Sequence, residues 1–400
     1  MREVAIVGVS MIKFGRYPDR DVAQLAAQSG FEALKDAGMT MKNVEALYSG
    51  NLYATSGSGQ RILQNLGQTG IPVVNVANAC ATGSTAFREA YFAIASGAYD
   101  VVMAVGSEQM GKQGLLGGAG RADPATALEG RVGSGLMPAV FGMAGMEHKK
   151  KYGTPLEHFA LASVKNHLHS TQNPLAQYQK ESPLDEVMNS RMIAYPNTLL
   201  MCCPTGDGAA AAILCSMEKA RQFTTQPIKV AASVLTSDPY TDRDLTMPDI
   251  NTLTRNAAAI AYKQAGLGPE DLSQVELHDC FATAELLHYE NLGLCGDGEA
   301  GKHVASGAPW ITNKIPTKYQ EDIAPFQDKT YAPKTTAVVN ASGGLLSKGH
   351  PLGATGVANI AEIVFHLRGQ AGGRQVEGSK VGLAHVIGLC SACTIHILTK

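Results

Sequence analysis

The chain contains the stretch Val76-Ala77-Asn78-Ala79-Cys80-Ala81-Thr82-Gly83-Ser84-Thr85, in which one cysteine stands among small residues. The stretch follows the apolar run 71–74 and precedes a helical pattern that begins at Phe87, so it predicts a turn from a strand into a helix. At such a turn, unpaired backbone N–H groups and the positive end of the helix dipole favour thiolate over thiol. Cys80 is therefore a candidate nucleophile, although a lone cysteine is more often a buried packing residue.

A second strand-to-helix turn supplies a candidate base for this thiol. Its sequence is Asn340-Ala341-Ser342-Gly343-Gly344-Leu345-Leu346-Ser347-Lys348-Gly349-His350-Pro351-Leu352-Gly353-Ala354-Thr355-Gly356. Alone, His350 between a glycine and a proline could be an exposed turn residue. Together with Cys80 it provides the imidazole that thiol activation requires.

A third segment that runs from a strand into a helix carries both a histidine and a cysteine. It reads Val275-Glu276-Leu277-His278-Asp279-Cys280-Phe281-Ala282-Thr283-Ala284-Glu285. Side chains two positions apart share one face of a strand, so His278 and Cys280 can point into the same cavity. Three strand ends therefore offer cysteine and histidine side chains to one site.

These three segments resemble the thiolase superfamily, and within it the sterol-carrier-protein type of thiolase. The first resembles the pattern Val-Asn-x-x-Cys-x-Ser/Thr-Gly, except that Ala77 stands where the asparagine is usual. Residues 343–356 are similar to Gly-Gly-x-x-x-x-Gly-His-Pro-x-Gly-x-Thr-Gly at every position. The tetrapeptide 278–281 resembles the one that marks this branch, where other thiolases have Asn-Glu-Ala-Phe. The resemblance covers essentially the whole chain.

The resemblance also implies roles for individual residues. Common thiolases carry Cys-x-Gly-Gly-Gly near the C-terminus, and the alignment places Gly388 at that cysteine, which leaves proton transfer to Cys280. If the alignment with this pattern is shifted by two residues, Cys390 instead occupies the position of the cysteine in Cys-x-Gly-Gly-Gly. His350 and His278 would form hydrogen bonds to the enolate oxygen. The backbone N–H groups of Cys80 and Cys390 would donate hydrogen bonds to the acyl oxygen. His278 could alternatively be a structural histidine beneath the site.

The two halves of the chain repeat. The helix and strand pattern of residues 26–47 is similar to that of residues 257–277, and the reactive turns 78–94 and 340–365 are likewise equivalent. Alternating strands and helices indicate parallel, mostly buried sheets, and the duplication indicates two lobes packed about a pseudo-twofold axis. Reactive turns from both lobes would then meet at the interface.

The resemblance implies an α/β fold with the five-layer αβαβα arrangement of thiolases. We expect an N-terminal lobe from residues 1–110 and about 200–225, and a C-terminal lobe from residues 226–400. Residues 111–199 break the repeat and are typical of the loop domain that covers the acyl chain and holds coenzyme A. Its glycine-rich run 111–120 lacks the Gly-Lys-Ser/Thr of a phosphate loop.

Composition narrows the class of protein. The chain has 400 residues, of which 45% are hydrophobic and 17% charged, so it can bury an extensive core. A formal charge of −2 without a long basic block disfavours a nucleic-acid partner. No membrane-spanning stretch or signal peptide is expected. Eight irregularly spaced cysteines favour a reducing cytoplasm, and the pair Cys390 and Cys393 has no second pair with which to bind a metal.

The predicted function is a thiolase-type acyltransferase that makes or thiolytically cleaves a 3-oxoacyl-CoA through an acyl-cysteine. No metal or redox cofactor is expected, because coenzyme A acts as the carrier of the substrate. Three alternatives are a decarboxylating ketosynthase, a retro-aldol lyase acting on a β-hydroxyacyl-CoA, and a noncatalytic acyl-CoA or lipid carrier. The resemblance further implies a homodimer or dimer of dimers, and a small subunit with a zinc ribbon and an OB-fold as a possible partner.

Overall fold

The computed structural model describes residues 1–54, 56–112, 137–223, 226–240, 249–389 and 391–400. Within these residues, a ten-stranded sheet runs in the order β10-β9-β11-β12-β8-β1-β7-β4-β2-β3. The strands of the first half are β1 (Val4–Met11), β2 (Ala46–Gly50), β3 (Val73–Val76), β4 (Val101–Gln109) and β7 (Asp207–Ser216). Those of the second half are β8 (Ile228–Thr236), β9 (Gln274–Glu276), β10 (Val338–Val339), β11 (Val381–Gly388) and β12 (Ala392–Thr399).

The two halves of the sheet have the same topology, as the sequence repeat predicted. In the first half, β2 lies between β3 and β4 and is parallel to both, and β7 lies antiparallel between β4 and β1. In the second half, β9 lies parallel between β10 and β11, and β12 lies antiparallel between β11 and β8. The halves join through a short antiparallel pairing of β1 with β8, in which Ala5 faces Lys229 and Ile6 faces Ile228.

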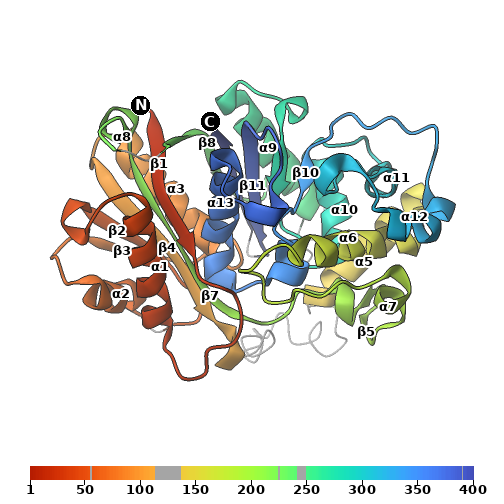
Figure 1. Cartoon of the computed structure of the whole chain (residues 1–400), viewed down its shortest axis with the longest axis horizontal. Coiled ribbons are helices and arrows are strands. Elements are labelled where there is room, and N and C mark those ends of the chain that lie inside the picture. The colour runs from red at the N-terminus through yellow and green to blue at the C-terminus, as the bar shows by residue number, and fades with distance from the viewer. Residues whose placement is uncertain (55, 113–136, 224–225, 241–248, 390) are drawn as a thin grey trace.

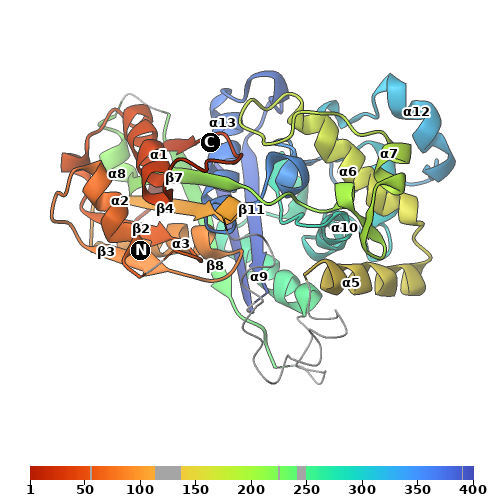
Figure 2. The ribbon, with the colours of Figure 1, turned by 90° about the horizontal axis from the view of Figure 1, so that it is seen from below.

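Helices form three layers around the two half-sheets (Figures 1 and 2). In the middle layer, α3 (Thr82–Ala95) packs against α13 (Leu352–Arg368), and α13 contacts strands of both halves. The outer layers are α1 (Val22–Asp36) with α2 (Ser58–Leu66) on the first half, and α9 (Ile250–Ala265) with α10 (Ala282–Asn291) on the second. The predicted five-layer αβαβα fold is confirmed.

The segment between β4 and β7 packs on the second half of the molecule (Figure 1). Its elements are α5 (Met137–Tyr152), α6 (Leu156–Ser170), α7 (Leu184–Asn189), β5 (Met192–Ala194) and β6 (Asn197–Thr198). Both α5 and α6 contact α10, and α6 also contacts α11 (Ala300–Ser306).

The remaining short helices are α8 (Met217–Ala220) and α12 (Thr317–Ile323). Residues 113–136 of the expected loop domain, which include most of the glycine-rich run, lie outside the described residues. The boundaries of the domains remain a prediction. Among the described residues, no helix has the length and apolarity needed to cross a bilayer.

Glycines allow the N-terminal turns of α3 and α13 to approach each other closely. A Cβ atom built on Gly83 would lie 2.4 Å from the carbonyl oxygen of Gly353, and one on Gly356 would lie 2.2 Å from the backbone nitrogen of Ser84. A Cβ on Gly353 would lie 2.3 Å from the carbonyl oxygen of Ser107 in β4. Because Cys80 precedes α3 and His350 precedes α13, these contacts bring the two reactive turns together.

Replacing Gly353 with alanine is expected to lower the free energy of unfolding by about 1–3 kcal/mol. The new methyl group would meet backbone oxygen rather than a side chain that could move, and this strain outweighs the gain of about 1 kcal/mol in helix propensity. Urea unfolding of Gly353→Ala measures the effect. The matched control is Gly15→Ala, because a Cβ at Gly15 meets nothing within 4 Å. Equal stability of the two variants would contradict the close approach.

Candidate active site

Cys80 lies on the turn between β3 and the N-terminus of α3, as the sequence predicted. The hydroxyl of Thr82 fixes this turn, because it accepts from the backbone N–H of Asn78 at 2.8 Å and donates to the carbonyl of Ala79 at 2.6 Å. Ala79 has a φ of 47°, in the left-handed region that residues other than glycine rarely adopt. The turn therefore holds the sulfur at the positive end of a helix.

His350 lies directly before α13 and is oriented by Thr355. The Nδ1 atom of His350 is 2.7 Å from Oγ1 of Thr355, and that hydroxyl also donates to the carbonyl of Pro351 at 3.0 Å. Because the hydroxyl proton is engaged with Pro351, the hydrogen between the two side chains belongs to Nδ1 of His350. The lone pair is thus on Nε2, which is buried and has no hydrogen-bond partner among the described residues. This tautomer can accept a proton.

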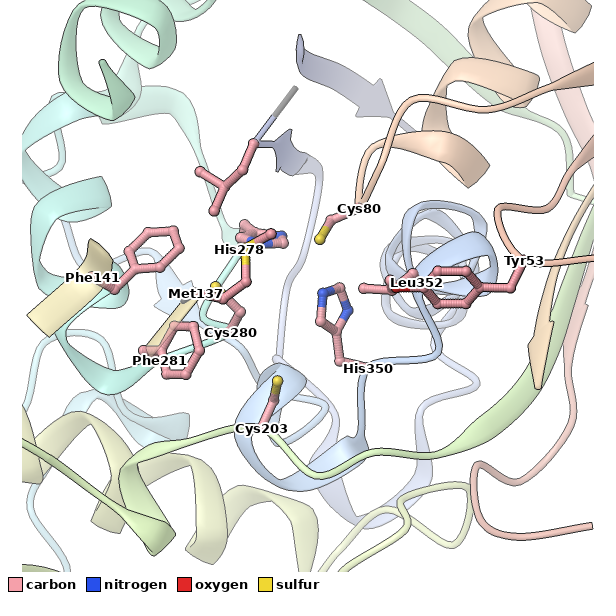
Figure 3. A pocket seen from close by; sticks show the side chains of 11 residues that line it. Tyr53, Cys80, Met137, Phe141, Cys203, His278, Cys280, Phe281, His350 and Leu352 are labelled. Atoms are coloured by element: carbon pink, nitrogen blue, oxygen red, sulfur yellow. The ribbon is translucent and has the colours of Figure 1, made fainter. Parts of the chain in front are cut away.

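The fold brings Cys80, His278 and His350 into one pocket (Figure 3). One ligand atom from each side chain lies within 4.8 Å of the other two. The histidine rings are 5.1 Å apart between centroids and nearly perpendicular, at 80°. The pocket has an empty volume of about 420 Å³, and its other described lining residues are Tyr53, Met137, Phe141, Cys203, Cys280, Phe281, Leu352 and Leu389.

Cys280 lines the same pocket but is almost completely buried. Burial, together with the neighbouring thiols, raises the pKa of Cys280 well above its ordinary value, so it is a neutral thiol at neutral pH. The backbone N–H of Cys203 donates to the carbonyl of Cys280 at 3.0 Å, and Cys203 also lines the pocket. The motifs in the sequence do not single out Cys203, and the pairing of its segment with Cys280 places it beside the site.

Gly388, at the end of β11, lies against the turn that carries Cys80. A Cβ atom at Gly388 would be 2.4 Å from the carbonyl oxygen of Asn78 and 3.3 Å from Cβ of Ala79. Any side chain there would displace the turn, so Gly388 has a steric role in positioning Cys80. Cys390 lies outside the described residues, and its predicted place in the oxyanion hole stays a prediction.

Burial keeps both histidines of the site neutral. It lowers the pKa of His278 to about 3, and burial together with the nearby His278 and Lys348 lowers the pKa of His350 well below its usual range. A neutral His350 can take a proton from Cys80, and a neutral His278 can donate a hydrogen bond to a developing oxyanion.

A buried polar network that the sequence did not reveal supports the segment 278–280 from below. Asn166, on α6, donates from Nδ2 to Asp279 at 2.7 Å and to Glu285 at 2.6 Å. Lys165 forms an ion pair with Glu285 at 3.0 Å, and both side chains are fully buried. The backbone N–H of Leu345 donates to Asp279 at 2.8 Å. The network ties α6 to the segments that carry Cys280 and His350.

The folded protein is expected to lose stability as the pH falls below about 6.5. Burial lowers the pKa of ten histidines, namely His158, His167, His169, His278, His288, His303, His350, His366, His385 and His396. Their unfolded pKa is near 6.5, so below that pH the unfolded chain binds more protons, and each histidine costs up to about 1.4 kcal/mol per pH unit.

Buried carboxyl groups have the opposite effect on the pH dependence of stability, but they are fewer than the buried histidines. Burial raises the pKa of Glu108 to about 7 and that of Asp279, which also lies near Glu285, to about 8, and it raises that of Glu276. These groups favour the folded state more strongly as the pH falls from 8 towards 4. Because histidines outnumber them, urea unfolding midpoints should drop steeply between pH 7 and pH 5.5. A midpoint that is constant over this range would contradict the neutral buried histidines.

Comparison with known proteins agrees with the fold and the motifs. The family model "Thiolase, N-terminal domain" matches residues 4–190, and "Thiolase C-terminal domain-like" matches residues 240–321 and 318–400. Sterol carrier protein 2 of Bos taurus is 42% identical over 98% of this chain and 72% of its own length. Acetyl-CoA acetyltransferase of Methanothermobacter thermautotrophicus is 38% identical and is covered completely, as is this chain.

Among solved structures, that of the "Ltp2-ChsH2(DUF35) aldolase" has a TM-score of 0.81 at 24% identity, and the match covers 98% of this chain and 97% of that one. That likeness establishes the fold, and the family models together span most of the sequence. The chain belongs to the thiolase family.

Proposed function

We propose that this protein is an acyl-CoA C-acyltransferase that makes or thiolytically cleaves a 3-oxoacyl-CoA through an acyl-Cys80 intermediate. The observation that carries the proposal is the meeting of Cys80, His278 and His350 within 4.8 Å at the end of a helix. The name of the acetyl-CoA acetyltransferase relative supports the same chemistry.

The first half-reaction transfers an acyl group to Cys80. The thiol proton passes to Nε2 of His350, and the sulfur attacks the carbonyl carbon of a thioester or of a 3-oxoacyl-CoA. Backbone N–H groups of Cys80 and Cys390 stabilise the oxyanion, an interaction worth about 10²–10³ in rate for each donor. When a thioester reacts, the coenzyme A thiolate leaves and recovers the proton from His350. Covalent catalysis thus divides one carbon–carbon step into two easier ones.

The second half-reaction, in the synthetic direction, needs an acid/base group beside the acylated sulfur. Cys280 passes its thiol proton to His350, and its thiolate removes the α-proton of a second acyl-CoA. The carbanion attacks the acyl-Cys80 carbonyl, and the released Cys80 sulfur recovers the proton from His350. His350 and His278 stabilise the enolate oxygen of that carbanion. The raised pKa of Cys280 supports its role in the degradative direction, because a neutral thiol is ready to protonate an enolate.

Intact-protein mass spectrometry after exposure to a panel of acyl-CoA and 3-oxoacyl-CoA esters tests the proposal. A single acyl adduct is expected, and it should be absent in Cys80→Ala. Cys280→Ala should still be acylated but should not exchange the α-protons of acetyl-CoA with solvent deuterium. Cys202→Ala is the matched control, because Cys202 does not line the pocket. Proton exchange that survives in Cys280→Ala would assign the acid/base role to Cys390.

Two other activities are distinguished by the same measurements. A lipid or acyl-CoA carrier, which the name of the sterol carrier protein 2 relative suggests, would bind the ester without forming an adduct. A retro-aldol lyase, which the name of the similar aldolase structure suggests, would cleave a β-hydroxyacyl-CoA without free coenzyme A and without Cys80. Product formation by Cys80→Ala from a β-hydroxyacyl-CoA would therefore favour the lyase.

The proposal extends to assembly and location. A homodimer or dimer of dimers in the cytoplasm is our expectation, and a small zinc-ribbon and OB-fold subunit is a candidate partner. The similar aldolase, whose name includes a DUF35 component, supports the search for such a subunit. Light scattering of the purified chain, alone and with a candidate subunit, measures both the oligomeric state and the association.

A further inference from the structure

The three side chains at the centre of the pocket form a set of ligands suited to a soft divalent cation. The sulfur of Cys80 and one ring nitrogen each of His278 and His350 lie within 4.8 Å of one another. Cysteine sulfur and histidine nitrogen are the donors that Zn²⁺ takes in tetrahedral protein sites. We propose that, without substrate, Cys80, His278 and His350 bind Zn²⁺ or a similar ion reversibly, and that the ion blocks acylation.

The orientation of His350 is that of a metal ligand. Its Nδ1 is held by Thr355 at 2.7 Å, which directs the lone pair of Nε2 away from that contact. Histidines that bind metals almost always have their other ring nitrogen fixed by a hydrogen bond of this kind. Nε2 of His350 and Nδ1 of His278 are both buried without a hydrogen-bond partner among the described residues. Coordination would satisfy the lone pair on Nε2 of His350, for which the described residues offer no partner.

Binding releases one proton. Zn²⁺ displaces the thiol proton of Cys80 to the solvent, and the Zn–S bond forms with no change in oxidation state. The fourth position remains for water.

The geometry needs only a small contraction. In a tetrahedral site with bonds of about 2.0–2.3 Å, neighbouring ligand atoms are roughly 3.3–3.8 Å apart. The three ligand atoms here lie within 4.8 Å of one another, so they need to approach by at most about 1–1.5 Å. Rotation of the Cys80 side chain, which is partly exposed on its turn, can supply such a movement. A bound ion occupies the sulfur and the Nε2 atom that acylation requires, so binding of metal and acylation exclude each other.

Cobalt titration of chelator-treated protein tests the site without any coenzyme A ester. One Co²⁺ per chain is expected, with a thiolate-to-cobalt charge-transfer band in the near ultraviolet that Zn²⁺ abolishes by competition. The band should be absent in Cys80→Ser, and the affinity should fall at least about 10-fold in His350→Gln. Cys202→Ser, a cysteine outside the pocket, should retain the band. Circular dichroism shows whether each variant is folded.

The outcomes separate this inference from the proposed function. No charge-transfer band at millimolar Co²⁺, or an unchanged band in Cys80→Ser, overturns the metal site whatever the acylation assay shows. In the acylation assay, Zn²⁺ at ten times its dissociation constant should slow adduct formation about 10-fold, and a chelator should restore it. Acylation that is unaffected at that occupancy would also refute the inference, while the acyltransferase proposal would stand.

Discussion

Replacing His350 with alanine or glutamine is expected to slow acylation of Cys80 by about 10²–10⁴-fold, the range that a positioned general base contributes. The reason is geometric, because His350 presents an unprotonated Nε2 to a pocket in which the sulfur lies within 4.8 Å. Rapid quenching followed by intact-mass analysis gives the rate of adduct formation. Thr355→Val, which removes the acceptor of the Nδ1 hydrogen, should slow acylation less than loss of the ring does.

His148→Gln serves as the matched control for this experiment. His148 is buried and hydrogen-bonded to Glu290 at 2.8 Å, but it does not line the pocket around Cys80. Replacing His148 should leave the acylation rate within about 2-fold of that of the unchanged protein, because it removes no group that the reaction uses. If His350→Gln were acylated at the rate of the unchanged protein, His350 would not be the base, and His278 would take its place as the candidate.

Replacing Lys165 with methionine is expected to lower the free energy of unfolding by about 3–5 kcal/mol. The change leaves Glu285 as a buried charge without its cation, close to Asp279, and removal of one partner of a buried ion pair costs about this much. Urea unfolding followed by circular dichroism measures the loss.

A double variant and a surface variant show whether the loss of stability in Lys165→Met comes from breaking the buried ion pair. Lys165→Met combined with Glu285→Gln should lose less stability than Lys165→Met alone, because no uncompensated charge remains. Lys180→Met removes an exposed partner of Glu186, at 2.7 Å, and should change the free energy by less than about 1 kcal/mol. Similar losses for the buried and the exposed lysine would contradict the network described beneath the site.

The sequence predicted the parts of the fold that local patterns encode. The turn at Cys80 follows an apolar strand and precedes a helix with regular apolar spacing, and both features depend only on neighbours in the chain. The repeat of these patterns was sufficient to predict two lobes and to place His350 opposite Cys80. The meeting of the two side chains, on which the functional hypothesis depended, is what the structure shows.

Features that depend on contacts between distant segments were not predictable in this way. Lys165 and Asn166 lie in a helix whose polar residues are typical of a solvated surface, and only the packing of α6 beneath Asp279 shows that they are buried. The place of Cys203 was not predictable either, because nothing near it in sequence indicates the pairing with Cys280. The steric role of Gly388 also arises from a neighbour about three hundred positions away, Asn78.

The topological equivalence of the two half-sheets extends to the reacting groups. Cys80 precedes α3 and His350 precedes α13, and these two helices occupy corresponding places in the duplicated architecture. The proposed nucleophile and the proposed base thus occupy corresponding positions, one in each half of the duplicated architecture. A fragment that contains a single copy would hold half of the catalytic pair, so reconstitution of activity would require both fragments to associate.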